Sequence, residues 1–148
     1  MQEELERDLK SALLGGDKAL VDTLRTLKSA LYYEAGSLGL KPEGMNQEQI
    51  RKVLSHEAKK RQEAADLYKK AGESERSDKE LQEKAAISKY LPPQLSEAEL
   101  GDLVNEEIGK VDQPTLKEMG GIIGAVRKRC EGQADGSLIA RLVKEKLQ

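Results

Sequence analysis

The sequence contains no Phe or Trp, only four Tyr among its 148 residues, a single Cys and a single His. Without large aromatic rings, a hydrophobic core has to be built from Leu, Ile, Val and Ala. One cysteine excludes an internal disulfide, which is typical of proteins kept in a reducing cytosol. One histidine excludes a multi-histidine metal site, and no Cys or carboxylate cluster has metal-ligand spacing. We therefore expect a cytoplasmic protein that binds no metal and no cofactor.

Long apolar runs are also missing. No stretch of about 18 apolar residues occurs, so we expect no membrane span and no membrane partner. The N-terminus, MQEELERDLK, is acidic and lacks the apolar centre of a signal peptide. The net charge of −2 gives no overall attraction to nucleic acid.

The charge is unevenly distributed along the chain. Residues 93–118 carry two basic and seven acidic residues, whereas residues 119–148 carry six basic and three acidic ones. A block with this modest excess is either a solvated helix surface or a contact region for a polyanion. Both interpretations stay open at the level of sequence.

What the sequence has in quantity is helix-forming residues with helical spacing. Leu20, Leu24, Leu27 and Leu31 recur at intervals of four, three and four, which places them on one face of a helix. Similar apolar stripes occur elsewhere, and no segment shows convincing strand alternation. Seven helices are predicted, with side-chain N-caps expected at Asp17, Asn46, Ser77, Ser96, Thr115 and Asp135.

Pro92-Pro93 is the strongest boundary, because two consecutive prolines remove two backbone donors and disfavour helix before each of them. We predict an all-α fold with two parts. Residues 1–91 form an N-terminal helical region of about four helices, and residues 94–148 form a C-terminal bundle of three short helices.

Two structural features are expected within these helices. Glu57 and Arg61, four residues apart on the third helix, are predicted to form an ion pair at the edge of the N-terminal core. Gly120 and Gly124 lie on one helix face together with the neighbouring Gly121, and we expect one of them to let another helix approach closely. The alternative is a close-approach surface for a ligand or an RNA backbone.

Catalytic chemistry is hard to find. His56 follows Leu54-Ser55 within the third predicted helix and is interpreted as a helix-surface residue, and Cys130 has no evident partner base. No pair of carboxylates is isolated enough to indicate acid–base catalysis. We predict no catalytic residues.

Four segments carry a resemblance to a known family. They are RTLKSALYYE (25–34), VLSHEAKKRQEAADLYKKAG (53–72), YLPPQLSEAEL (90–100) and MGGIIGAVRKRCEGQADGSLIARLVKEKL (119–147). In order and over nearly the whole chain they resemble the YqeY family of bacterial cytosolic proteins. One departure is Gln133, where the family usually has Arg or Lys before Ala-Asp-Gly.

The resemblance implies more than the composition does. In that family the C-terminal part is similar to the tail domain of the B subunit of the tRNA-dependent amidotransferase, a helical domain that contacts tRNA. The amidase chemistry of that enzyme sits in another subunit, and its kinase-like chemistry sits in the body of the B subunit. Neither region has a counterpart in this sequence.

Three hypotheses for function follow. The first is a non-catalytic module that binds tRNA or associates with the amidotransferase. The second is a helical adaptor that binds another protein through its N-terminal helices. The third is an amidotransferase-like carbon–nitrogen ligase with glutamine as the nitrogen donor, which is how the family is usually labelled. The first needs cations for phosphates, and the candidates are Arg127, Lys128, Arg129, Arg141 and Lys144.

Overall fold

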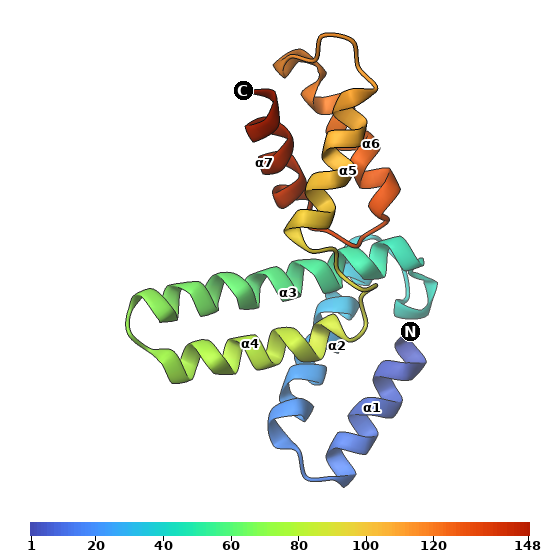
Figure 1. Cartoon of the computed structure of the whole chain (residues 1–148). Helices are drawn as coiled ribbons and strands as arrows, with labels where there is room; N and C mark the ends of the chain where they lie inside the picture. Colours follow the sequence, from blue (N-terminus) through green and yellow to red (C-terminus); the bar gives the residue numbers. More distant parts are fainter. The chain divides into compact units, whose positions relative to one another are not determined.

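The structure, a computed structural model, describes residues 1–148 and contains seven α-helices and two short 3-10 helices but no strand. The predicted all-α fold is therefore confirmed. The chain forms two compact units, Met1–Leu91 and Pro92–Gln148 (Figure 1). None of the helices has the length and apolar character needed to cross a membrane.

The first unit contains α1 (Gln2–Leu14), α2 (Lys18–Ser37), α3 (Gln47–Lys70) and α4 (Ser74–Ser88), with the 3-10 turn η1 (Pro42–Gly44) before α3. Local capping residues set several of these boundaries. The Asp17 side chain accepts a hydrogen bond from the backbone N–H of Leu20. Asn46 and Gln49 form the predicted capping box at the start of α3. These caps satisfy backbone donors that a helix start leaves without partners.

The core of the first unit is aliphatic, as the composition requires. Leu24, Leu27 and Leu31 of α2 are at most 1% exposed and lie at its centre. Side chains from the other three helices of the unit, such as Leu5, Leu54 and Ile87, surround them. The predicted leucine stripe on α2 is therefore the axis around which this core is built.

Helices α3 and α4 pair as a long hairpin that extends from the rest of the unit (Figure 1). The predicted N-cap at Ser77 is wrong, because α4 already begins at Ser74. Ser77 is instead 5% exposed inside the hairpin, and its hydroxyl donates to the Ala65 carbonyl oxygen across 2.9 Å. Leu81 of the same helix is 41% exposed.

The predicted ion pair on α3 forms. The Arg61 guanidinium contacts the Glu57 carboxylate, and Lys60 Nζ lies 3.1 Å from the other carboxylate oxygen. Arg61 also lies 3.6 Å from Glu83 on α4. The negative charge of Glu57 is thus matched by Arg61 and Lys60, and a buried carboxylate requires such a partner.

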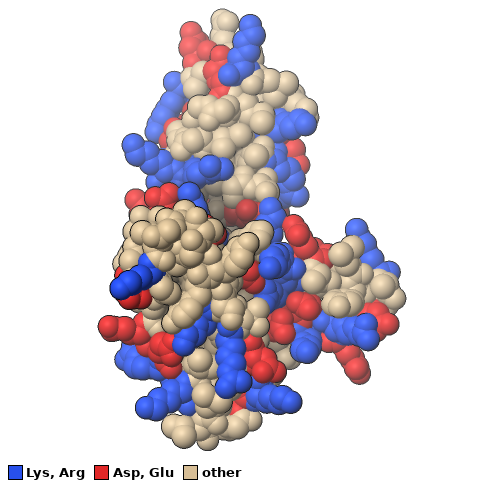
Figure 2. All heavy atoms as spheres, turned by 180° about the vertical axis from the view of Figure 1, so that it is seen from behind, with Lys and Arg blue, Asp and Glu red and all other residues tan.

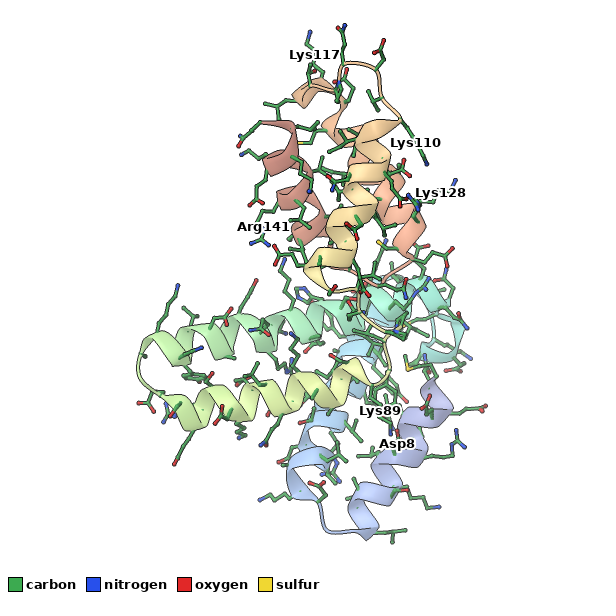
Figure 3. The ribbon with its side chains drawn as sticks, in the orientation of Figure 1. Asp8, Lys89, Lys110, Lys117, Lys128 and Arg141 are labelled. Carbon is green, nitrogen blue, oxygen red and sulfur yellow. The ribbon has the colours of Figure 1, made fainter.

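The end of α4 is tied to the first helix. The Tyr90 hydroxyl donates to the Asp8 carboxylate, and Lys89 Nζ lies 3.5 Å from the same oxygen (Figure 3). Burial and this hydrogen bond raise the pKa of Tyr90 far above its usual range. The hydrogen bond from Tyr90 lowers the pKa of Asp8. The contact fixes where the chain leaves the first unit.

The second unit contains α5 (Glu97–Gly109), the 3-10 turn η2 (Leu116–Glu118), α6 (Met119–Cys130) and α7 (Gly136–Leu147). Ser96 and Glu99 form the predicted capping box of α5, and Thr115 and Glu118 form the one before α6. The second unit has its own hydrophobic core, to which each of the three helices contributes fully buried aliphatic side chains. Cys130 is buried in the same core.

Candidate nucleic-acid interface

The three consecutive basic residues predicted to bind RNA lie in the last turn of α6. Positive charge at this position complements the helix dipole whatever else it does. Arg129 has a clear structural role: its guanidinium lies 2.7 Å from Glu106 and 3.1 Å from Glu107, both on α5. Arg129 therefore joins α6 to α5, and its charge is already matched.

Glu107 is the buried partner in this link and is 8% exposed. Lys110 Nζ donates to its carboxylate at 2.9 Å, and Arg129 donates to the same oxygen at 3.1 Å. The hydrogen bond from Lys110, followed by that from Arg129, lowers the pKa of Glu107. A carboxylate with two cationic donors stays ionised and holds the two helices together.

The two candidates on α7 are placed differently. Arg141 lies 2.7 Å from Glu97 on α5 and 3.9 Å from Glu145 on its own helix. In Figure 3, Arg141 points away on one side of the unit and Lys128 on the other. Lys144 is exposed. The five predicted cations are therefore brought together on one unit but do not form one continuous patch.

Arg127 lies against the start of α7. A methyl group placed on Gly136 would meet Arg127 Nη2 at 2.8 Å, closer than real side chains pack. Asp135, the predicted N-cap of α7, accepts a hydrogen bond from the backbone N–H of Ser137 at 3.3 Å. Because Arg127 Nη2 is the end of a flexible side chain that can move aside, the contact does not by itself require glycine at position 136. The proximity of Arg127 and Gly136 is not evident from the sequence, because the two residues are nine positions apart.

The predicted packing role of Gly120 and Gly124 is wrong. Both glycines and Gly121 are exposed, and a methyl group on any of them would meet nothing within 4 Å. The buried side of α6 is formed by Ile122 and Val126 instead. Glycine is therefore not needed at these positions to make room for another helix. We call the exposed surface formed by Gly120, Gly121 and Gly124 the glycine face.

Lysines lie near both ends of the glycine face. Lys117 is exposed in the turn before α6, and Lys128 is exposed near its C-terminus, and neither has an ion-pair partner. Their separation of 11 residues corresponds to about 16 Å along a helix. Viewed from behind, the second unit shows an uncharged area bordered by basic and acidic side chains (Figure 2). Lys117 was not among the cations predicted from the sequence. It lies four, seven and 11 residues before Gly121, Gly124 and Lys128, and this spacing is typical of residues on one face of a helix.

A model of the Yqey-like protein family matches residues 2–147. This chain belongs to the YqeY family. No curated protein matches it. The match covers both units of the YqeY chain and the Pro92-Pro93 connection between them. The N-terminal helices are therefore part of the family pattern, as is the C-terminal unit with the glycine face.

Proposed function

We propose that this YqeY chain is a non-catalytic module that binds structured RNA, with tRNA as the first candidate, through the glycine face of α6. Lys117 and Lys128 bind backbone phosphates at its two ends, and Arg127 adds charge next to Lys128. The module belongs to bacterial translation in this proposal, where it acts alone or together with the tRNA-dependent amidotransferase.

The exposed glycines are the observation that carries the proposal. A glycine inside a helix costs up to about 1 kcal/mol relative to alanine. Three of them in 12 residues of α6 weaken the helix, and packing gives no reason for them because alanine would fit at each position. Close approach of a bound molecule to the backbone of α6 explains the three glycines.

A ribose-phosphate backbone fits this surface. Without side chains, the helix backbone presents a shallow surface between two flexible ammonium groups, and lysine binds phosphate as a point charge. The second unit contains no aromatic residue, which argues against stacking on single-stranded bases. Recognition of duplex shape by phosphate and 2′-hydroxyl contacts needs no aromatic ring. The resemblance of the C-terminal part to a tail domain that contacts tRNA supports the same ligand.

Mobility shifts of total tRNA at several salt concentrations test the proposal. We expect affinity in the micromolar range or weaker for this slightly acidic chain, on the order of non-specific binding. Lys128→Gln removes one phosphate contact and should lower the slope of log K against log salt by about 0.7–0.9. Gly124→Leu adds bulk to the glycine face without touching the core, so it should weaken binding while the protein stays folded.

Arg141→Gln is the matched control, because it removes one arginine from the other side of the same unit. Its effect on tRNA affinity should stay within about twofold, or roughly 0.4 kcal/mol. The proposal fails if Gly124→Leu and Lys128→Gln leave the affinity unchanged. It also fails if no complex forms at low salt at protein concentrations of about tens of micromolar, with or without the amidotransferase, since non-specific binding alone reaches that range.

A further inference from the structure

The first unit contains the hairpin of α3 and α4, which the RNA proposal does not use. The inner end of the hairpin belongs to the aliphatic core, to which α3 contributes residues as far as Ala58 and α4 contributes Ile87. No side chain between these two residues is part of a hydrophobic core. We call residues 59–86, which include the tip of the hairpin, its outer segment (Figure 1). The inner end and the outer segment are therefore held by different kinds of contact.

The outer segment buries little apolar surface. More than half of its residues are charged, and Ala65 is its one buried apolar residue. Its two leucines do not pack inside, because Leu67 is 67% exposed and Leu81 is 41% exposed. A helix in a folded protein owes most of its stability to the packing of an apolar face. The outer segment lacks such a face, whereas the inner end of the hairpin has one.

Polar contacts join the two helices of the outer segment instead. The Ser77 hydroxyl donates to a backbone carbonyl oxygen of α3 at 2.9 Å. Lys84 Nζ donates to the side-chain oxygen of Gln62 at 2.7 Å, and Arg61 lies 3.6 Å from Glu83. Each such contact contributes little net stability, because it replaces hydrogen bonds to water. These contacts fix how the helices pair but add little to the free energy that keeps them closed.

The tip of the hairpin adds no further support. Glu73 occupies the N-cap position of α4 and makes no capping hydrogen bond through its side chain. The first backbone N–H groups of a helix have no partner within the helix itself. The turn depends on Gly72, whose φ of +76° is unfavourable for a residue with a side chain. The tip therefore does not compensate for the weak contacts along the segment.

We infer that the outer segment opens as one cooperative unit while the aliphatic core of the first unit stays folded. The two helices open together because neither has an apolar face that would stabilise it without the other. The open form is a sparsely populated member of the native ensemble, reached by local unfolding. The hairpin thus gives the first unit a conformational change that leaves its core intact.

Native-state hydrogen exchange of the full chain at increasing urea concentrations tests this inference. The outer amides are those of Leu67, Tyr68 and Leu81, and the core amides are those of Leu27 and Leu31. We expect the outer amides to share one protection factor, about tenfold or more below that of the core amides. Their exchange should also depend less on urea, because local opening exposes less surface than global unfolding.

Two other patterns of exchange would contradict the inference. Equal protection of the outer and core amides would show that the outer segment opens only when the whole unit unfolds. Protection that falls gradually toward Gly72 would show that the helix ends fray residue by residue instead of opening together.

Two variants separate local opening from global unfolding. Ile50→Val removes one methylene from the core, where Ile50 is 7% exposed. This variant should speed exchange of the core amides about fivefold and leave the outer amides unchanged. Gly72→Ala strains the turn and should speed exchange of both sets about tenfold, because global unfolding includes opening of the hairpin. Faster exchange of the outer amides in Ile50→Val, or no change of the outer amides in Gly72→Ala, would overturn the inference.

Discussion

Glu57 is ionised although it is only 6% exposed. Burial pushes its pKa upward, but hydrogen bonds from Lys60 and Arg61 together push it downward more strongly, so the pKa lies below the ordinary glutamate value. A carboxyl group with a lowered pKa in the folded state stabilises the protein above its ordinary pKa. This stabilisation is lost as the pH falls through the lowered value.

Glu57→Gln should therefore destabilise the first unit by about 1–3 kcal/mol at neutral pH, because the variant removes the charged acceptor that the half-buried Arg61 and the exposed Lys60 share. The difference from the wild type should shrink as the pH falls below the ordinary glutamate pKa of about 4.3 and through the lowered pKa of the folded state, where the wild-type carboxyl takes up its proton. Urea unfolding at both pH values measures this. Glu63→Gln on the same helix is the control and should change stability by less than about 0.5 kcal/mol, because Glu63 is exposed. Equal stability of Glu57→Gln and wild type would show that the pair contributes nothing.

At the scale of the single helix, the sequence predicts those features that depend on residues close together in the chain. The capping boxes at Asn46, Ser96 and Thr115 were predicted because a cap depends on residues three positions apart. The prediction for Ser77 was wrong because its hydroxyl donates to the Ala65 carbonyl oxygen on α3 instead of capping a helix. This contact becomes visible only when α3 and α4 are paired.

The candidate RNA interface was predictable to a smaller extent for the same reason. The basic block around residues 127–129, which suggested the interface, is evident from the charge pattern, and RNA binding by this block stays a prediction. Which cations are matched by α5, and which side of α6 is buried, depends on contacts between helices far apart in the sequence. The role of the glycines in particular could not be read from their spacing, because a glycine at a contact and a glycine in open space look alike there.

Gly72 and Gly124 both lack close neighbours, so substitutions at these positions test the effect of backbone conformation on stability without a change in packing. Gly124→Ala in α6 should stabilise the protein by about 0.5–1 kcal/mol, since alanine is the better helix former. Gly72→Ala, in the turn between α3 and α4, should destabilise it by about 1–2 kcal/mol, because Gly72 has φ of +76° and nothing within 4 Å of an added methyl group. Thermal unfolding of both variants measures this. Loss of stability in Gly124→Ala would contradict the open surroundings of that glycine.

At the scale of the whole molecule, the chain has two hydrophobic cores, and no buried residue belongs to both. The leucine-centred core uses residues before Pro92, and the core around Val104, Val126 and Ile139 uses residues after it. Each unit therefore has the apolar contacts it needs within its own stretch of chain.

We expect residues 1–91 and 92–148, produced separately, each to unfold cooperatively in urea. The shorter fragment should be stable by no more than about 3–5 kcal/mol, as expected for so small a core. A fragment of residues 92–131 lacks α7 and is the control; it should not fold, because Ile139, Leu142 and Val143 are missing from its core. An unfolded 92–148 fragment beside a folded intact chain would show that the second unit depends on the first.

All four tyrosines lie before residue 92, and the one cysteine is buried in the second core. Tyrosine emission therefore reports on the first unit alone. Thiol labelling reports on the second unit alone, because burial raises the pKa of Cys130 and the thiol reacts only when the core opens. The unmodified chain thus has a separate optical and chemical reporter for each half. tRNA on the glycine face should slow labelling of Cys130 and leave the tyrosine emission unchanged.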